Sequence, residues 1–366
     1  MQDASKEERY LRRLFSQYYS GCKISVSSPH MREFGFGGWE RKIEFRHIAV
    51  SGEGELRARL VSEAPLYVSH SVAYYEFPSA RPMVKKNWKG ADLVFDLDAP
   101  EHSCGKFTCQ QCLDGVKEDA IKLIEDFLLP DFGLSESEIS VNFSGSRGYH
   151  VHVKSQDFMA LGREERREIA DYITGTGLEF GRLFWKDGKK LFGPKPTDGG
   201  YGGKFARSYL ARLEDEKFAE SISRKLKESK ERERLKQAIQ KGSWDIGISN
   251  CEKKLRGVFD EMKLTLAGRI DANVTADVVK LIRLAGSLHG GSGLEAKSVK
   301  LSGLAGFEPM RDAQVFMKGS LRIKAVEDIP AVPHIVSEPI ANGRIVELAQ
   351  AEAVYLLCKK AAVLAD

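Results

Sequence analysis

The spacing of apolar residues changes character several times along the chain. Residues 6–19, KEERYLRRLFSQYY, place Tyr10, Leu14 and Tyr18 at helical intervals, together with Leu11 and Phe15, which predicts a helix facing the core. From 32 to 77 the pattern changes to short alternating runs such as KIEFRHIAV and LYVSHSVAYYEF, which predict strands. The chain therefore mixes helices and strands from its start.

The next segments continue this mixture. The apolar run ADLVFDLD, 91–98, predicts another strand, and a helix is expected over 116–129 because Pro130 would end it. Residues 139–153, ISVNFSGSRGYHVHV, predict two strands joined by a glycine turn.

The middle of the chain has a different composition. Residues 157–258 are expected to form a mainly helical insertion, since they contain a highly charged helical run within 207–241. Acids and bases alternate in that run, which is typical of a solvated face rather than a nucleic-acid stripe. The catalytic core would then comprise 1–156 and 259–366.

After the insertion, strand character is expected again in LTLAGRIDANV, 264–274. Thr275 is predicted to cap a helix that carries Val278, Val279, Leu281, Ile282 and Arg283. The predicted fold class is α/β, a mixed α+β core interrupted once by the helical insertion and carrying a small metal knuckle.

Composition narrows the class of protein only slightly. With 366 residues, 42% hydrophobic, the chain is long enough for one large domain or two. A net charge of +4 is compatible with a polyanionic partner without demanding one. The chain starts without an apolar signal region and has no apolar run of membrane-spanning length, so we expect a cytosolic protein with no membrane partner.

Two aspartates are the first candidates for chemistry. Asp96 and Asp98 are two residues apart on a predicted strand, so their side chains point to the same face. Oxygen ligands at this spacing suit Mg²⁺ or Mn²⁺, which retain waters and accept substrate phosphates. Strand-end aspartates are also common loop caps, and other metal-dependent enzymes use such pairs. Asp271 is a candidate third carboxylate, with pairing to Arg269 or to a backbone amide as the alternative.

Two glycine-rich turns add basic and hydroxyl groups. SGSRGYH, 144–150, contains Ser144, Arg147 and His150, all of which can donate hydrogen bonds to an anion. RLAGSLHGGSG repeats this chemistry with Arg283 and His289. Each turn alone could be a simple exposed hairpin. Together with three acids, they predict a site for a nucleoside triphosphate and its metal ions.

A cluster of cysteines follows the paired aspartates. Cys109 and Cys112 form a C-x-x-C pair, and Cys104 precedes them by five residues. In a reducing compartment this spacing favours a structural Zn²⁺ site over a disulfide framework. His102 or a distant residue would supply the fourth ligand.

Taken together, these motifs resemble those of a known family, the catalytic small subunit of archaeal and eukaryotic replicative DNA primases. YLRRLFSQYYSG and MREFGF resemble its N-terminal segments, and LVFDLD resembles its acidic motif. SGSRGYHVHV and RIDANVTADVVKLIRLAGSLHGGSG are similar to its later motifs, and the His/Cys cluster falls where its zinc knuckle (102–112) lies. Residues 157–258 carry little of the resemblance.

The resemblance implies a role for each matching residue. Asp96, Asp98 and Asp271 would hold two divalent cations, Mg²⁺ or Mn²⁺. Ser144, Arg147, His150, Arg283 and His289 would bind the nucleotide, with Glu33 and Arg46 near the active site. The zinc ligands would be His102, Cys104, Cys109 and Cys112. Ser146 stands where eukaryotic relatives often carry a basic residue, so one phosphate contact would be absent.

The implied activity is template-directed synthesis of short RNA primers, with DNA as a further product, on single-stranded DNA from NTPs or dNTPs. The family works with a large subunit that carries an iron–sulfur cluster. The location would be cytoplasmic, at nucleoid replication sites, for an archaeal protein and nuclear for a eukaryotic one. Two other functions are compatible with the motifs: a metal-dependent phosphodiesterase or nuclease, and a non-catalytic zinc-containing nucleic-acid-binding module.

Overall fold

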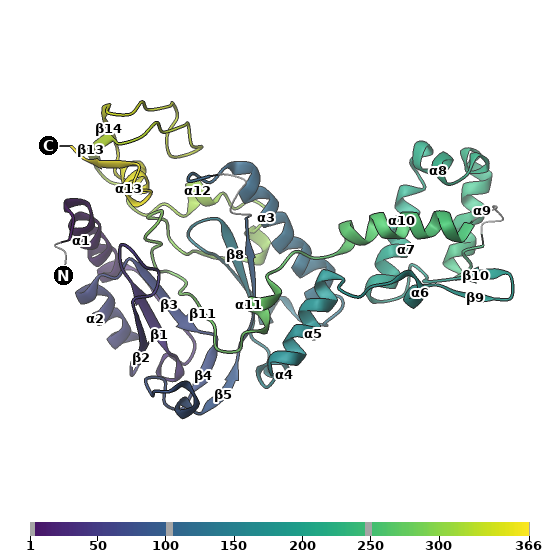
Figure 1. The fold of residues 1–366 in the computed structure, drawn as a ribbon, viewed down its shortest axis with the longest axis horizontal. Coiled ribbons are helices and arrows are strands. Elements are labelled where there is room, and N and C mark those ends of the chain that lie inside the picture. The colour runs from purple at the N-terminus through teal and green to yellow at the C-terminus, as the bar shows by residue number, and fades with distance from the viewer. Residues whose placement is uncertain (1–3, 100–104, 246–250, 366) are drawn as a thin grey trace. The chain divides into compact units, whose positions relative to one another are not determined.

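The chain forms two compact units in the computed structural model, which describes residues 4–99, 105–245 and 251–365 (Figure 1). The first unit contains three stretches of chain, and the second unit contains two. The first comprises Met1–Ile121, Ser135–Glu168 and Ile270–Asp366, and the second comprises Lys122–Leu134 and Ile169–Arg269. Each unit is described by itself below.

The first unit begins with a helix packed beside an antiparallel sheet. Helix α1 (Lys6–Gly21) starts where the Ser5 hydroxyl accepts a hydrogen bond from the Glu8 amide, and it buries one apolar face. The sheet order is β11-β3-β1-β2, and its strands are β1 (Phe34–Gly37), β2 (Phe45–Ile48), β3 (Tyr67–Ser71) and β11 (Leu281–Arg283). Helix α2 (Glu53–Glu63) lies beside α1 (Figure 1).

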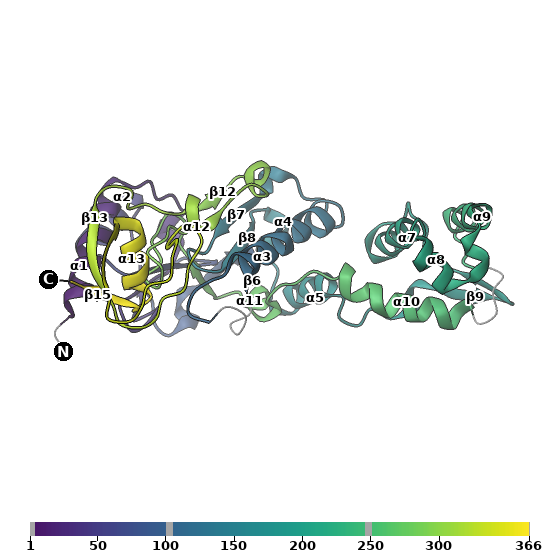
Figure 2. The same ribbon diagram turned by 90° about the horizontal axis from the view of Figure 1, so that it is seen from above.

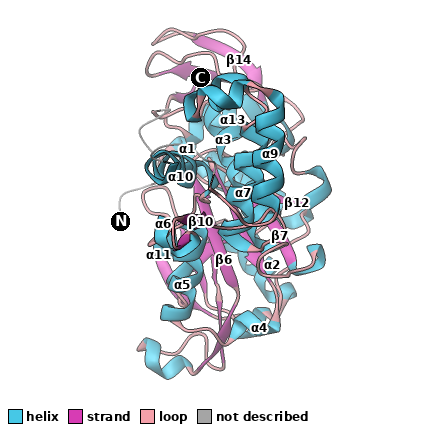
Figure 3. Cartoon of the chain, turned by 90° about the vertical axis from the view of Figure 1, so that its right-hand side faces the viewer, coloured by secondary structure: helices cyan, strands magenta, loops and turns pink. Residues whose placement is uncertain are grey.

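A second antiparallel sheet carries the paired aspartates. Its order is β12-β7-β8-β6, with strands β6 (Leu93–Asp98), β7 (Ile139–Phe143), β8 (Gly148–Val153) and β12 (Ser298–Val299). Strands β6 and β7 are visible in Figure 3. Strand β8 is buried along its whole length because it lies between β7 and β6. The predicted strand–turn–strand of residues 139–153 is therefore confirmed.

Smaller elements complete the first unit. They are α3 (Gln110–Lys122, ending at the unit boundary), α4 (Gln156–Met159), α11 (Ala272–Ala276), α12 (Pro309–Asp312) and the strand pair β4 (Ala73–Tyr75) and β5 (Trp88–Ala91). At the C-terminal end, β13 (Ser320–Ala325) pairs with β14 (Ile345–Ala349) and β15 (Ala362–Leu364), and α13 (Gln350–Cys358) packs beside them (Figure 2). Short 3-10 turns occupy Pro29–Met31, Met83–Lys86, Glu136–Glu138 and Leu301–Gly303.

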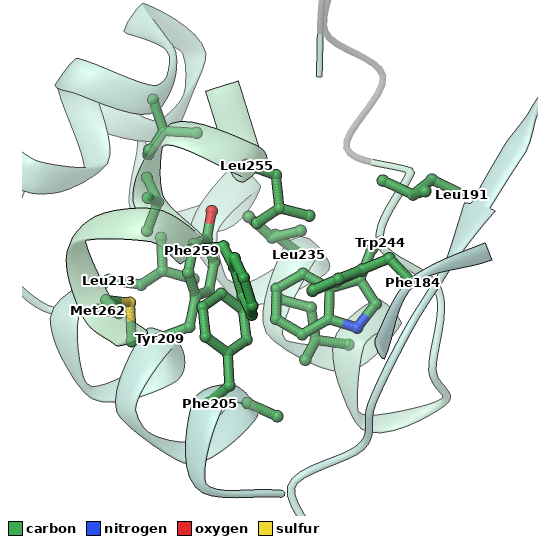
Figure 4. Packing of buried hydrophobic residues seen from close by; sticks show 14 of the residues in the cluster. Phe184, Leu191, Phe205, Tyr209, Leu213, Leu235, Trp244, Leu255, Phe259 and Met262 are labelled. Carbon is green, nitrogen blue, oxygen red and sulfur yellow. The ribbon is translucent and has the colours of Figure 1, made fainter. Parts of the chain in front are cut away.

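The second unit is built mainly of helices around an aromatic core. Trp244, Phe184, Phe205 and Phe259 pack in the centre of this core, with Tyr209 against Trp244 (Figure 4). The elements are the π-helix Leu123–Leu128, α6 (Phe180–Leu183), β9 (Trp185–Asp187), β10 (Lys190–Phe192), α7 (Gly200–Arg212), α8 (Glu216–Ile222), the 3-10 turn Arg224–Lys227, α9 (Ser229–Gln240) and α10 (Cys251–Leu266). Helix α5 (Arg163–Thr174) runs from the first unit into the second.

Three local predictions were wrong. The charged run, residues 223–241, forms helix α9 over Ser229–Gln240 but does not begin as an α-helix, because a 3-10 turn occupies Arg224–Lys227. Residues 264–274 do not form a strand, since α10 continues to Leu266 and Asp271 caps α11. The helix expected after Thr275 ends at Ala276, and Arg283 lies on strand β11 because residues 281–283 pair with β3.

The mixed α/β class is confirmed by these helices and sheets. Across the described residues, no helix is both long and apolar enough to cross a membrane.

Candidate active site

Asp96 and Asp98 lie on one face of the end of β6. The register pairs Asp96 with His150 and Asp98 with Gly148 on β8. The His150 Nε2 atom lies 3.5 Å from Oδ1 of Asp96. That oxygen is buried and has no hydrogen-bond partner among the described residues. A buried carboxylate oxygen without a partner is costly, which is typical of a position that binds a ligand.

Both aspartates of this cluster have raised pKa values. Burial, and then the charge of Asp271, raise the pKa of Asp96 to about 6, against the opposing charge of Lys280. Desolvation and the charge of Asp96 also raise the pKa of Asp98. Burial lowers the pKa of His150 to about 4, so its imidazole is neutral at neutral pH. A bound cation would relieve the repulsion between the two aspartates.

Asp271 joins the cluster through its backbone. Its amide donates to the carbonyl of Asp96 at 3.0 Å, which brings the start of α11 against β6. The Oδ1 atom of Asp271 accepts hydrogen bonds from the amides of Asn273 and Val274 at 2.9 and 3.1 Å. Pairing with a backbone amide is the alternative to metal binding that the sequence leaves open for Asp271. Within 4–99, 105–245 and 251–365, no three His, Cys, Asp or Glu side chains form a group that could hold a metal ion as they stand. Asp96 and Asp98 are the candidates for a Mg²⁺ site. This ion often binds only one or two carboxylates and takes its other ligands from water and phosphate.

Gly148 is the residue that allows Asp98 to sit against β8. A Cβ atom at position 148 would lie 2.0 Å from the Asp98 Oδ1 atom and 2.5 Å from the carbonyl oxygen of Leu97. The Gly148 amide also donates to the Ser144 hydroxyl at 3.1 Å. The side chain of Ser144 therefore organises its own turn.

The two glycine-rich turns pack directly on each other. Gly145 has a φ of +83°, and a Cβ there would lie 2.7 Å from the Cβ of His289. The Ser292 hydroxyl donates to the Gly145 carbonyl. The structure thus brings Gly145 and His289 into one region, although they are 144 positions apart in the sequence.

Arg283 and His289 are held by Tyr67 on β3. The guanidinium of Arg283 lies 5.0 Å from the centre of the Tyr67 ring and donates to the Val68 carbonyl at 3.3 Å. The His289 ring packs edge-on against the Tyr67 ring, with 5.1 Å between the two ring centres. Burial lowers the pKa of Arg283 to about 10 and that of His289 well below its usual value.

Three lysines near the site were missed from the sequence. The charge of Lys42, in the β1–β2 hairpin, acts on both Asp96 and Asp98, and that of Lys280 acts on Asp96. Burial, and then the charge of Arg147, lower the pKa of Lys359 to about 8. Lys42 and Lys359 lie outside the quoted motifs and approach the site only through the fold, whereas Lys280 lies within the run 269–293. A concentration of cations around buried acids suits a highly charged anion bound through metal ions.

The buried carboxylate of Glu33 forms ion pairs with the exposed Arg46 and the buried Lys86. The Arg46 Nε atom lies 3.0 Å from Oε1 of Glu33, and the Lys86 Nζ atom lies 3.2 Å from Oε2. Burial alone would raise the pKa of Glu33, but the hydrogen bond from Arg46 and the charge of Lys86 outweigh it and lower that pKa. Glu33 therefore acts as a fixed anchor for the two cations.

The predicted zinc knuckle lies only partly within the described residues. The sulfur atoms of Cys109 and Cys112 lie 3.1 Å apart at the start of α3, close enough to ligate one metal ion. His102 and Cys104 lie outside the described residues.

The chain is similar to known replication proteins over almost its whole length. A family model described as DNA primase small subunit matches residues 95–301. The DNA primase small subunit PriS of Methanocella arvoryzae is 36% identical, with 96% of this chain and 97% of the relative covered. The PriS proteins of Thermoplasma volcanium and Archaeoglobus fulgidus are 35% and 34% identical, with 89% and 96% of this chain and 88% and 96% of those relatives covered.

Proposed function

Because this chain belongs to the DNA primase small-subunit family, it is a DNA-directed primase, and we propose that the Asp96–Asp98 cluster is where it transfers nucleotides. The reaction joins the α-phosphate of an incoming nucleotide to a 3′-hydroxyl and releases pyrophosphate. The observation that carries this proposal is the packing of two basic glycine turns against each other beside the paired aspartates. This arrangement supplies separate groups for metal ions and for phosphates.

The acidic groups would hold divalent cations, Mg²⁺ or Mn²⁺. Asp96 contributes a partner-free Oδ1 atom, Asp98 the neighbouring carboxylate, and Asp271 the oxygen not used to cap α11. Such cations, when bound, lower the pKa of the attacking 3′-hydroxyl and neutralise charge on the leaving pyrophosphate. The raised pKa of Asp96 supports this role because a cation would favour its ionised form.

The basic groups would bind the triphosphate. Arg147 and Arg283 offer guanidinium forks, and His289 offers a ring nitrogen held in place by Tyr67. Ser144 would act mainly by holding its turn, since its hydroxyl accepts from the Gly148 amide. His150 is neutral and next to Asp96, so it can donate one hydrogen bond without repelling a cation. Positioning and charge stabilisation by these side chains would account for catalysis.

We further propose a structural Zn²⁺ site formed by Cys109 and Cys112, with Cys104 and His102 as the remaining ligands. The C-x-x-C spacing supports it, together with the position of the two cysteines at the start of α3. The site would fix the segment that follows Asp98 and hence the direction of that carboxylate.

The remaining assignments follow from the family. The first unit would carry catalysis, with the mainly helical second unit as the inserted subdomain. As a small subunit, the chain would act on a single-stranded DNA template within a primase complex, with an iron–sulfur large subunit as partner. The archaeal source of its relatives favours a cytoplasmic, nucleoid-associated location. A nuclease and a non-catalytic binding module are both set aside by family membership.

The decisive experiment is labelled-nucleotide incorporation on primed and unprimed single-stranded DNA with Mg²⁺ or Mn²⁺. We expect lengthened products and pyrophosphate with the wild type and none with Asp96→Asn. Shortened products would instead indicate a nuclease. Full activity of a pure Asp96→Asn protein would refute the assignment of the site. Adding the large subunit would show whether initiation on unprimed template depends on it.

A further inference from the structure

An exposed surface rich in apolar and basic side chains lies beside the candidate active site. Phe45, Phe77 and Val84 expose 64%, 53% and 84% of their surface. Two exposed cations, Arg81 and Lys85, accompany them. We call these five residues the aromatic–basic surface.

The two segments that form this surface are fixed to each other. Phe45 begins β2, and the other four residues lie in the turn between β4 and β5. The Arg81 guanidinium donates to the Arg46 carbonyl at 3.3 Å. Beneath them, the carboxylate of Glu33 pairs with Arg46 from one segment and with Lys86 from the other. These bonds hold the start of β2 and the β4–β5 turn against each other.

The surface carries a net positive charge. Residues 77–89, FPSARPMVKKNWK, contain four cations and no acid. Lys86 and Lys89 pair with Glu33 and Glu76. Across the described part of the chain, neither Arg81 nor Lys85 forms an ion pair with a carboxylate. Both charges are thus free to meet an anion.

The β1–β2 hairpin leads to the aromatic–basic surface, since β2 begins at Phe45. Lys42, in the same β1–β2 hairpin as Phe45, acts electrostatically on both Asp96 and Asp98. Only three positions separate Lys42 from Phe45. A template strand that passes this hairpin would reach the aromatic–basic surface at Phe45.

We propose that the aromatic–basic surface binds the single-stranded template, with bases stacked on Phe45 and Phe77 and phosphates contacted by Arg81 and Lys85. The proposal rests on the proposed function, because it assumes that nucleotide transfer occurs at Asp96. Exposed aromatic rings beside unpaired cations are typical of proteins that bind single strands without sequence preference. Charge favours a nucleic-acid occupant, because both side chains without a carboxylate partner among the described residues are cations and the template is a polyanion.

The test is binding of a fluorescein-labelled dT12 oligonucleotide, measured by anisotropy in EDTA without nucleotide. We expect Phe45→Ala to weaken binding about tenfold, the loss of one stacked base. Arg81→Gln should reduce the slope of log affinity against log salt by about 0.7, the loss of one phosphate contact. The matched controls are Trp185→Ala, an aromatic that is 58% exposed in the second unit, and Arg322→Gln on β13, and both should bind as the wild type does. Thermal melting checks that every variant is folded.

Unchanged affinity in both Phe45→Ala and Arg81→Gln would overturn the proposal. Equal losses in the control variants would overturn it too, since binding would then be spread over the whole protein. If Phe45→Ala binds the oligonucleotide normally but no longer binds the large subunit, the surface is a protein interface. The Asp96→Asn protein separates the two proposals: incorporation tests the active site, whereas oligonucleotide binding without metal tests the surface.

Discussion

The Nε2 atom of His150 lies 3.5 Å from the Oδ1 atom of Asp96, across the ladder between strands β8 and β6. The imidazole is neutral and the carboxylate oxygen has no hydrogen-bond partner among the described residues, so neither charge nor hydrogen bonding satisfies Asp96. Catalytic sites commonly contain buried polar groups without partners. The free-energy cost of burying such a group is offset when substrate and cations bind to it.

Asp96→Asn should abolish nucleotide addition and also stabilise the metal-free protein. The folded pKa of Asp96, about 6, lies above its ordinary value, so the folded state binds the extra proton and stability falls as pH rises from about 4 to 6. Above pH 6 the variant should gain on the order of 2 kcal/mol. Urea unfolding in EDTA at pH 4.5 and 7.5 would measure this gain. An equal gain at both pH values would contradict the explanation.

Gly148→Ala should impair catalysis through Asp98. The new methyl group would overlap the Asp98 carboxylate and lie 2.5 Å from the Leu97 carbonyl oxygen, so the Asp98 side chain and the end of β6 must both shift. A displacement of about 1 Å can reduce kcat about 100-fold. Gly115→Ala is the control, because an added Cβ meets nothing within 4 Å there and alanine favours helix α3. Normal kcat in a folded Gly148→Ala protein would show that the position of Asp98 is not critical.

Arg283→Ala should mainly raise the KM for nucleotide. The guanidinium is held against the Tyr67 ring and the Val68 carbonyl, so it is preorganised for phosphate. Loss of one charge-assisted contact should raise KM roughly tenfold or more. Steady-state kinetics on a primed template would test this, with Arg283→Lys expected to be intermediate. An unchanged KM would remove Arg283 from the phosphate site.

Lys359 should make triphosphate binding depend on pH near 8. Burial, and then the charge of Arg147, lower its pKa to about 8 in the free protein, and a bound polyanion would raise it. Affinity should therefore be highest below pH 8 and fall as pH rises further. Titration calorimetry with tripolyphosphate from pH 7 to 9 would measure the trend, and Lys359→Gln should flatten it. A persistent slope in that variant would assign the titration to another group.

Cys109→Ser should release zinc and lower the melting temperature. The sulfurs of Cys109 and Cys112 are adjacent, so loss of one would leave a metal site incomplete. Metal analysis of purified protein would show one zinc per chain in the wild type and less in the variant. Cys22→Ser is the control, since Cys22 lies outside the cluster. A zinc content of one in Cys109→Ser would refute the knuckle.

Local pattern determined much of the site by itself. The two-residue spacing of Asp96 and Asp98 on an apolar strand puts both carboxylates on one face, because side chains alternate along a strand. The strand–turn–strand around Ser144 was predictable for the same reason, since glycine marks the turn and alternation marks the strands. These features depend on neighbours in the sequence.

Tertiary structure decided the rest. Leu281–Arg283 form a strand because β3 offers a pairing edge, which overrides the helical spacing. Asp271 reaches Asp96 through one backbone hydrogen bond between distant segments, and Lys42 and Lys359 approach the site only through the fold. Contacts between residues far apart in the sequence leave no periodic signal, so the sequence determined which groups could react and the packing of sheets and turns determined which of them meet.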